Sequence, residues 1–153
     1  MIDDYTTPLP GSSSSKPTTR ELTDEEIKDL INISINAKEH SYCPYSNFRV
    51  GCALLTENGT WYLGATICAE RTAIIKAVSE GQREFIAIGV STDQHEFIAP
   101  CGMCRQFLAE FVHNSFPIYL VKPDRTHKKV VFEHLLPNAF RPESLLPKTD
   151  END

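Results

Sequence analysis

The sequence lacks long apolar runs, a secretory leader and an excess of positive charge. No stretch approaches the roughly 20 apolar residues that a membrane-spanning helix needs, and residues 1–5 show neither the basic nor the apolar region of a secretory signal. The formal net charge of −6 over 153 residues opposes the displacement of counterions on which non-specific binding to nucleic acids depends. We therefore expect a cytoplasmic protein, able also to enter the nucleus, whose partner is neither a membrane nor a nucleic-acid polymer.

Cysteine is scarce and its count is odd. Five cysteines in a reducing compartment do not form a disulfide framework, so metal ligation or catalysis explains them better. Cys43 and Cys52 are interpreted as small buried residues without chemistry. This leaves Cys68, Cys101 and Cys104 as candidate functional residues.

The composition predicts one folded domain with unstructured ends. Residues 1–20 are rich in serine, threonine and proline and hold few large apolar side chains, so they cannot offset the entropy cost of becoming ordered. We predict a disordered tail over 1–20, a single folded domain over 21–147 and a disordered end over 148–153. A chain with 41% hydrophobic residues at this length can bury one substantial core.

The pattern of caps, turns and apolar runs predicts alternating helices and strands. A capping box over 23–26, followed by apolar residues at helical spacing, predicts a helix to about residue 40. Strand formers over 48–56, with Asn58-Gly59 beyond them, predict a hairpin whose return strand covers 60–64. The other expected elements are a helix at 69–79, a strand buried on both faces at 85–91, a helix at 102–113, strands at 116–121 and 129–132, and a short helix at 133–136. This order predicts an α/β fold with a mixed sheet between helix layers.

The three remaining cysteines each stand at the start of a predicted helix. A helix N-terminus lowers the pKa of a thiol and so favours the thiolate that zinc requires. None of the five histidines lies beside these segments, so a fourth protein ligand is missing. A catalytic zinc site keeps one position for water, whereas a structural site is closed by four protein ligands. We therefore predict one catalytic Zn²⁺ per chain, held by Cys68, Cys101 and Cys104.

Two charged residues follow the first of these cysteines. Glu70, in the first helical turn, is placed to face the open metal position and is predicted to carry protons, taking one from a zinc-activated water. Arg71 is predicted to offset the negative charge of three thiolates. The alternatives are a solvated first-turn carboxylate for Glu70 and a plain surface charge for Arg71. The pattern Cys-x-Glu followed by Pro-Cys-x-x-Cys is the signature of the zinc deaminases.

From Ser41 to Leu145 the chain resembles the small cytidine deaminases, a homotetrameric class with three cysteine ligands. The segments that carry the resemblance are 42–51 (YCPYSNFRVG), 67–73 (ICAERTA), 76–81 (KAVSEG), 100–106 (PCGMCRQ) and 135–140 (LLPNAF). The resemblance implies a three-layer α/β/α sandwich with a five-stranded mixed sheet, and conversion of cytidine and deoxycytidine to uridine and deoxyuridine in pyrimidine salvage. It also implies that Phe48 lines the base pocket and that Phe140 is contributed to it by a neighbouring subunit.

One segment departs from the family pattern. Relatives usually carry a segment resembling Asn-x-Glu-Asn-Ala-x-Tyr before the first zinc cysteine, and its Asn and Glu hold the ribose hydroxyls. Here residues 59–68 run directly into the cysteine without Asn or Glu. This predicts weaker ribose binding and relaxed sugar selectivity, with the zinc chemistry retained. A smaller departure is Arg141, where relatives usually have glycine.

Three alternatives remain open from the sequence. The chain is a deaminase of another cytosine-containing small molecule, such as the free base, or a catalytically silent, zinc-stabilised subunit that binds a nucleoside or joins an oligomer. The third alternative is a redox dithiol at Cys101 and Cys104.

Overall fold

The computed structural model describes residues 20–66 and 68–145. The predicted tail before Arg20 and the predicted end at 148–153 lie outside the described residues. No helix among the described residues is long and apolar enough to cross a membrane. The elements in chain order are α1 (Asp24–Glu39), β1 (Val50–Thr56), β2 (Trp61–Ala65), α2 (Ala69–Ser79), β3 (Phe85–Thr92), α3 (Gly102–Leu108), β4 (Pro117–Val121), β5 (His127–Val131), α4 (Phe132–Leu135) and a 3₁₀ helix (Pro142–Leu145).

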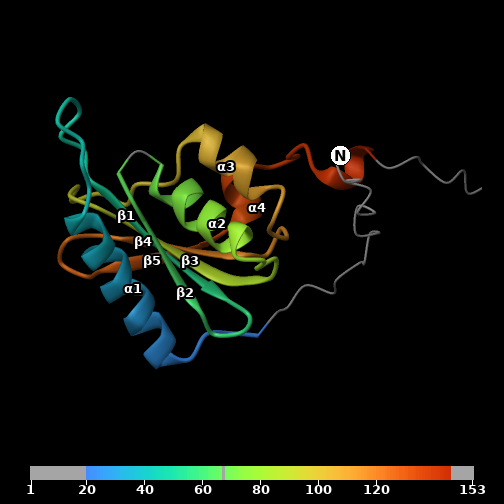
Figure 1. The fold of residues 1–153 in the computed structure, drawn as a ribbon, viewed down its shortest axis with the longest axis horizontal. Helices are drawn as coiled ribbons and strands as arrows, with labels where there is room; N and C mark the ends of the chain where they lie inside the picture. The colour runs from blue at the N-terminus through green and yellow to red at the C-terminus, as the bar shows by residue number, and fades with distance from the viewer. Residues whose placement is uncertain (1–19, 67, 146–153) are drawn as a thin grey trace, which may run out of the picture.

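The strands form one five-stranded mixed sheet in the order β2-β1-β3-β4-β5. The pair β3–β4 is parallel and the other three pairs are antiparallel. All eight residues of the central strand β3 are buried, as expected for a strand that is covered on both faces. Figure 1 shows α1 on one face of the sheet and α2, α3 and α4 on the other. The predicted three-layer α/β/α sandwich is confirmed.

The third helix is shorter than predicted. The pattern predicted a helix over 102–113, but α3 ends at Leu108 and the chain tightens into turns beyond it. Arg141, from the C-terminal segment, donates to the carbonyl oxygens of Ala109 (3.3 Å) and Val112 (2.7 Å). These carbonyl groups beyond the end of α3 are thus satisfied by a residue distant in sequence. The prediction for this helix end was wrong.

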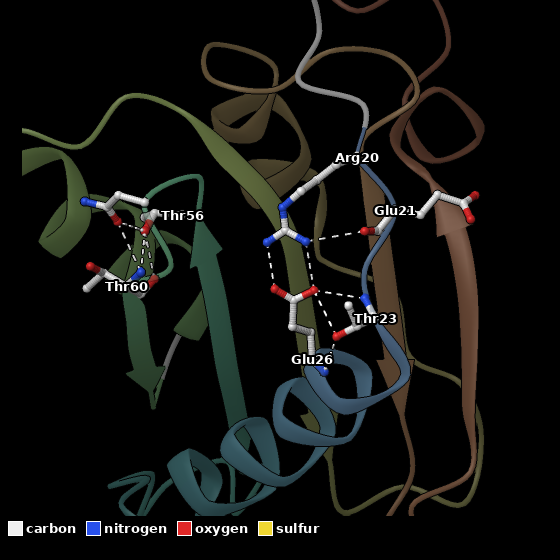
Figure 2. A network of polar contacts seen from close by, with 7 residues as sticks. Arg20, Glu21, Thr23, Glu26, Thr56 and Thr60 are labelled. Atoms are coloured by element: carbon white, nitrogen blue, oxygen red, sulfur yellow. Dashed lines mark hydrogen bonds and ion pairs between the residues drawn. The ribbon is translucent and has the colours of Figure 1, made fainter.

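The start of α1 is fixed by the predicted capping box. Thr23 accepts from the backbone N–H of Glu26 (3.1 Å), and Glu26 accepts in return from the backbone N–H of Thr23 (2.9 Å). Arg20 forks onto the same carboxylate with two hydrogen bonds of 2.8 and 2.7 Å (Figure 2). Figure 2 also shows Thr56 and Thr60 bonded across the β1–β2 turn, which confirms the predicted hairpin.

The Arg20 hydrogen bonds lower the pKa of Glu26 from 4.5 to about 2. A carboxyl whose pKa is lower in the folded protein adds stability above its unfolded pKa and loses it as the pH falls through its folded pKa. Because Arg20 is 41% exposed and the pair is screened by water, we expect Glu26→Gln to cost about 1 kcal/mol of unfolding free energy at neutral pH. Most of this difference should be lost near pH 2. Urea unfolding at neutral pH and at pH 2 measures this difference, with Glu25→Gln as the control. An equal loss of unfolding free energy at the two pH values would contradict the prediction.

Helix α2 packs closely on strand β2 at Gly64. A Cβ at this position would lie 1.8 Å from the carbonyl oxygen of Ala69, the first residue of α2, and 2.9 Å from the backbone nitrogen of Ala73. Only glycine therefore allows the helix to approach the strand this closely. The contact sets the position of the first turn of α2.

Gly64→Ala should destabilise the fold, because backbone atoms of α2 cannot move aside as a flexible side chain would. We expect a loss of about 3 kcal/mol in unfolding free energy. The matched control is Gly102→Ala, where a Cβ meets nothing within 4 Å. Chemical denaturation of the two variants measures the effect, and equal stabilities would contradict the close packing.

Candidate metal centre and active site

Two helix starts bring three cysteine sulfurs together. Cys68 is the N-cap of α2, Cys101 is the N-cap of α3, and Cys104 lies in the first turn of α3. The Sγ atom of Cys101 lies 3.9 Å from that of Cys68 and 3.5 Å from that of Cys104, and all three lie within 4.8 Å of one another. Cys68 has a φ of 55°, in the left-handed region that residues other than glycine seldom adopt.

These spacings fit a single zinc ion. A tetrahedral Zn²⁺ with Zn–S bonds of about 2.3 Å holds its sulfur ligands about 3.8 Å apart. The two sulfur distances of 3.9 and 3.5 Å lie on either side of that value. Within the described residues, the group that can hold a metal ion contains these three cysteines and no histidine or carboxylate. The donor set therefore leaves a fourth position for a ligand from outside the protein.

The thiols differ in how readily they ionise. The backbone N–H of Cys104 lowers the pKa of Cys101, as predicted for a thiol at a helix start. The same prediction is wrong for Cys104, because this residue is fully buried and burial raises the pKa of its thiol. Zinc binding deprotonates a coordinating thiol outright, so a raised pKa in the metal-free site does not exclude ligation.

Glu70 is buried beside the sulfur cluster. It lies in the first turn of α2 and is only 4% exposed, with its Oε2 accepting from Cys104 Sγ at 3.6 Å. Burial raises the pKa of this carboxyl. The solvated first-turn carboxylate that was the alternative interpretation of Glu70 does not match a residue buried to this extent.

Arg71 contacts the sulfur cluster from the same helical turn. Its Nη2 donates to Cys68 Sγ at 2.8 Å, while its buried Nε has no hydrogen-bond partner among the described residues. The guanidinium thus lies against a thiol of the cluster. Its contact places positive charge beside the sulfurs.

A cavity of about 280 Å³ opens beside these groups. Its lining includes Cys68, Glu70 and Cys101, and also Phe48. Phe140 does not line it; this residue is 57% exposed in the segment after α4. The other lining residues are Ser46, Val50, Thr66, Val90, Thr92, Ile98 and Ala99.

The sequence analysis missed the hydroxyl groups of this cavity. Ser46 and Thr66 lie in loops, and Thr92 ends a buried strand. A polar residue at the end of an otherwise apolar run was a usable signal for Thr92, but the loop residues offered none. Strand β2 ends at Ala65 and Cys68 already caps α2, so the connection before the metal cluster is short, as the departure from the family pattern predicted.

Comparison with known proteins agrees with this geometry. The family model described as the cytidine and deoxycytidylate deaminase zinc-binding region matches residues 24–120. The chain belongs to the cytidine and deoxycytidylate deaminase family. Because the matched region is a zinc-binding one and the three cysteines can hold a metal ion, the predicted zinc cofactor is confirmed.

Individual relatives cover most of the chain. A probable cytidine deaminase of Dictyostelium discoideum is 42% identical over 142 residues, which span 86% of this chain and 95% of the relative. A cytidine deaminase of Sporosarcina psychrophila is 44% identical over 129 residues, or 78% of this chain and 95% of the relative. The crystal structure of cytidine deaminase from Burkholderia pseudomallei superimposes with a TM-score of 0.71 and 37% identity, covering 78% of this chain and all of that one.

Proposed function

We propose that this protein is a zinc-dependent hydrolytic deaminase that converts cytidine and deoxycytidine to uridine and deoxyuridine. The observation that carries the proposal is the buried Glu70 carboxyl, which contacts one sulfur of the three-cysteine group and lines a cavity with Cys68 and Cys101. Cys68, Cys101 and Cys104 hold the zinc, and Glu70 is the catalytic residue. The family and the named relatives support the same activity.

Glu70 carries the protons of the reaction. When bound, zinc supplies a water nucleophile at neutral pH by lowering the pKa of that water. The Glu70 carboxylate accepts a proton from the attacking water and passes it to the ring nitrogen beside the amino-bearing carbon. It then takes the remaining proton from the oxygen added to that carbon and delivers it to the amine, which leaves as ammonia while the carbonyl of uracil forms. Burial raises the pKa of this carboxyl, which favours a group that both accepts and donates a proton.

Arg71 offsets the charge of the thiolates through its bond to Cys68. Because a hydrogen bond to a charged group is worth about 1.5–3 kcal/mol, we expect Arg71→Gln to lower kcat about tenfold. Zinc content of Arg71→Gln should stay at one per chain. The kcat of Arg71→Lys should lie between those of the wild type and Arg71→Gln. Steady-state kinetics with metal analysis measures this. An unchanged kcat would contradict this role and favour the alternative that Arg71 is a plain surface charge.

The proposal also includes two aromatic residues that contact the substrate and a homotetrameric assembly. Phe48 packs against the pyrimidine ring, since it already lines the cavity. Phe140 enters the cavity of a neighbouring subunit in a homotetramer; its exposure, and that of Ile75 and Met103 on α2 and α3, supports this. The enzyme acts in pyrimidine salvage in the cytoplasm, with the nucleus as a second location.

A second substrate class is favoured by the lining of the cavity. The hydroxyls of Ser46, Thr66 and Thr92 each already accept a backbone N–H, from Phe48, Tyr42 and Gln94 respectively. Glu70 is the one carboxylate among the described lining residues, and it is engaged with Cys104. A pair of sugar hydroxyls therefore meets weak acceptors, which favours turnover of free cytosine and of sugar-modified nucleosides as well.

The test is ultraviolet absorbance with zinc-loaded protein and separate samples of cytidine, deoxycytidine, deoxycytidylate and cytosine, with ammonia measured in parallel. We expect loss of the cytosine band and stoichiometric ammonia with both nucleosides. The nucleotide should be poor, because its phosphate meets no cation among the described lining residues. One zinc per chain with no turnover of any cytosine compound would contradict the proposal and favour a silent binding subunit.

A further inference from the structure

Asp93 is the centre of an ion-pair network whose members Arg49 and Asp93 are next in sequence to residues that line the cavity. It directly follows β3, and its Oδ1 accepts from Lys38 Nζ at 2.8 Å. Arg49 forks onto both carboxylate oxygens, with Nε at 2.7 Å and Nη2 at 3.0 Å. Lys38 also donates to the carbonyl oxygen of Thr92 at 3.4 Å, and Arg49 reaches Glu39 at 2.8 Å. We call Lys38, Arg49 and Asp93 the clamp.

The clamp joins two segments whose neighbouring residues line the cavity side by side. Arg49 stands between Phe48 and Val50, both of which line the cavity. Asp93 follows Thr92, which also lines it. Val50 pairs with Thr92 at the last position of the β1–β3 ladder. Beyond this pair, no β1–β3 ladder hydrogen bonds hold the two strands together. The Arg49–Asp93 fork continues the connection where the sheet ends.

Burial makes this connection specific. The Lys38 side chain is only 4% exposed, so its ammonium group needs the Asp93 carboxylate as its partner. The bidentate arginine fork fixes orientation as well as distance, which a single hydrogen bond does not. The last turn of α1 and the ends of β1 and β3 are therefore held together through one carboxylate.

We propose that Asp93 is a positioning residue for substrate binding, which holds Phe48 and Thr92 at their places on the cavity wall through Arg49 and Lys38. This inference rests on the proposed deaminase function. Asp93 touches neither the sulfur cluster nor Glu70, so it acts on how the pyrimidine is held and leaves proton transfer unchanged. Its loss should therefore appear in KM and in ligand affinity.

The test is Asp93→Asn, assayed with cytidine well below the unfolding temperature. We expect KM to rise about tenfold with kcat within about threefold and one zinc per chain, because a loss of uniform binding changes KM alone. The dissociation constant of uridine, measured by calorimetry, should rise in parallel. A purely structural role gives a different result: unfolded molecules lower the apparent kcat and leave the KM of the folded fraction unchanged, which would overturn the inference.

Two further variants serve as a control and as a second test of the clamp. Asp124→Asn removes another carboxylate that accepts hydrogen bonds, here from Thr126 in the β4–β5 turn and outside the cavity lining, and should leave KM unchanged. Arg49→Lys keeps the charge but loses the fork; it should raise KM even if Asp93→Asn fails to fold, and an unchanged KM would contradict the clamp. A wild-type protein that turns over no cytidine would instead contradict the proposed function, and this inference with it.

Discussion

Glu70→Ala will reduce kcat for cytidine by about 1,000-fold, because positioned acid–base catalysis contributes about 10²- to 10⁴-fold and no other carboxylate lines the described part of the cavity. Glu70 lies 3.6 Å from Cys104 Sγ in a buried position, so a proton carrier at this point serves both the attacking water and the ring. Stopped assays of uridine formation at saturating cytidine measure the change.

The control separates proton transfer from metal loss and from folding. Glu25→Ala removes an exposed first-turn glutamate of α1 and should leave kcat unchanged. Zinc content of Glu70→Ala should remain one per chain, because the carboxyl is not part of the metal-holding group. If Glu70→Ala keeps its zinc and retains more than about a tenth of wild-type kcat, Glu70 does not carry the protons of the reaction.

Cys104→Ala will lose zinc and, with it, stability. Removing one of three protein ligands should weaken zinc binding by at least about 100-fold, since even supporting contacts around a metal are worth 10- to 100-fold in affinity. A ligand that binds only the folded state stabilises it in proportion to its occupancy. The variant should therefore unfold at a lower temperature than the wild type. Added chelator should lower the unfolding temperature of the wild type toward that of the variant.

Cys52→Ala is the matched control for this variant. Cys52 and Cys104 are both fully buried, so both substitutions leave the same small void, but Cys52 is outside the metal-holding group. Zinc analysis and thermal unfolding, with and without chelator, separate the two effects. Equal zinc content in the two variants would show that Cys104 is not a ligand.

Local patterns in the sequence were sufficient for the order of the elements and for the metal cluster. The capping box at Thr23, the Asn58-Gly59 turn and the buried run of β3 each depend on neighbouring residues, and the structure agrees with them. Cys68, Cys101 and Cys104 could be grouped because helix starts and their spacing are visible in the chain. Their contacts follow from two helices that pack on one face of the sheet.

Features that depend on tertiary contacts could not be predicted. Helix α3 ends at Leu108, and Arg141, from a segment distant in sequence, donates to the carbonyl oxygens of Ala109 and Val112 just beyond it. The raised pKa of Cys104 comes from burial that the sequence pattern did not reveal. The clamp at Asp93 joins three segments, and only the fold shows that Lys38 and Arg49 meet there.

A zinc titration of metal-stripped protein, with cytidine turnover measured at each addition, is the decisive test of zinc-dependent deamination. We expect no turnover without metal, a linear rise on adding Zn²⁺, and a plateau at one equivalent per chain, with uridine and ammonia formed in equal amounts. Turnover that persists in the stripped protein, or its absence at every zinc ratio, would contradict a deaminase built on Cys68, Cys101, Cys104 and Glu70.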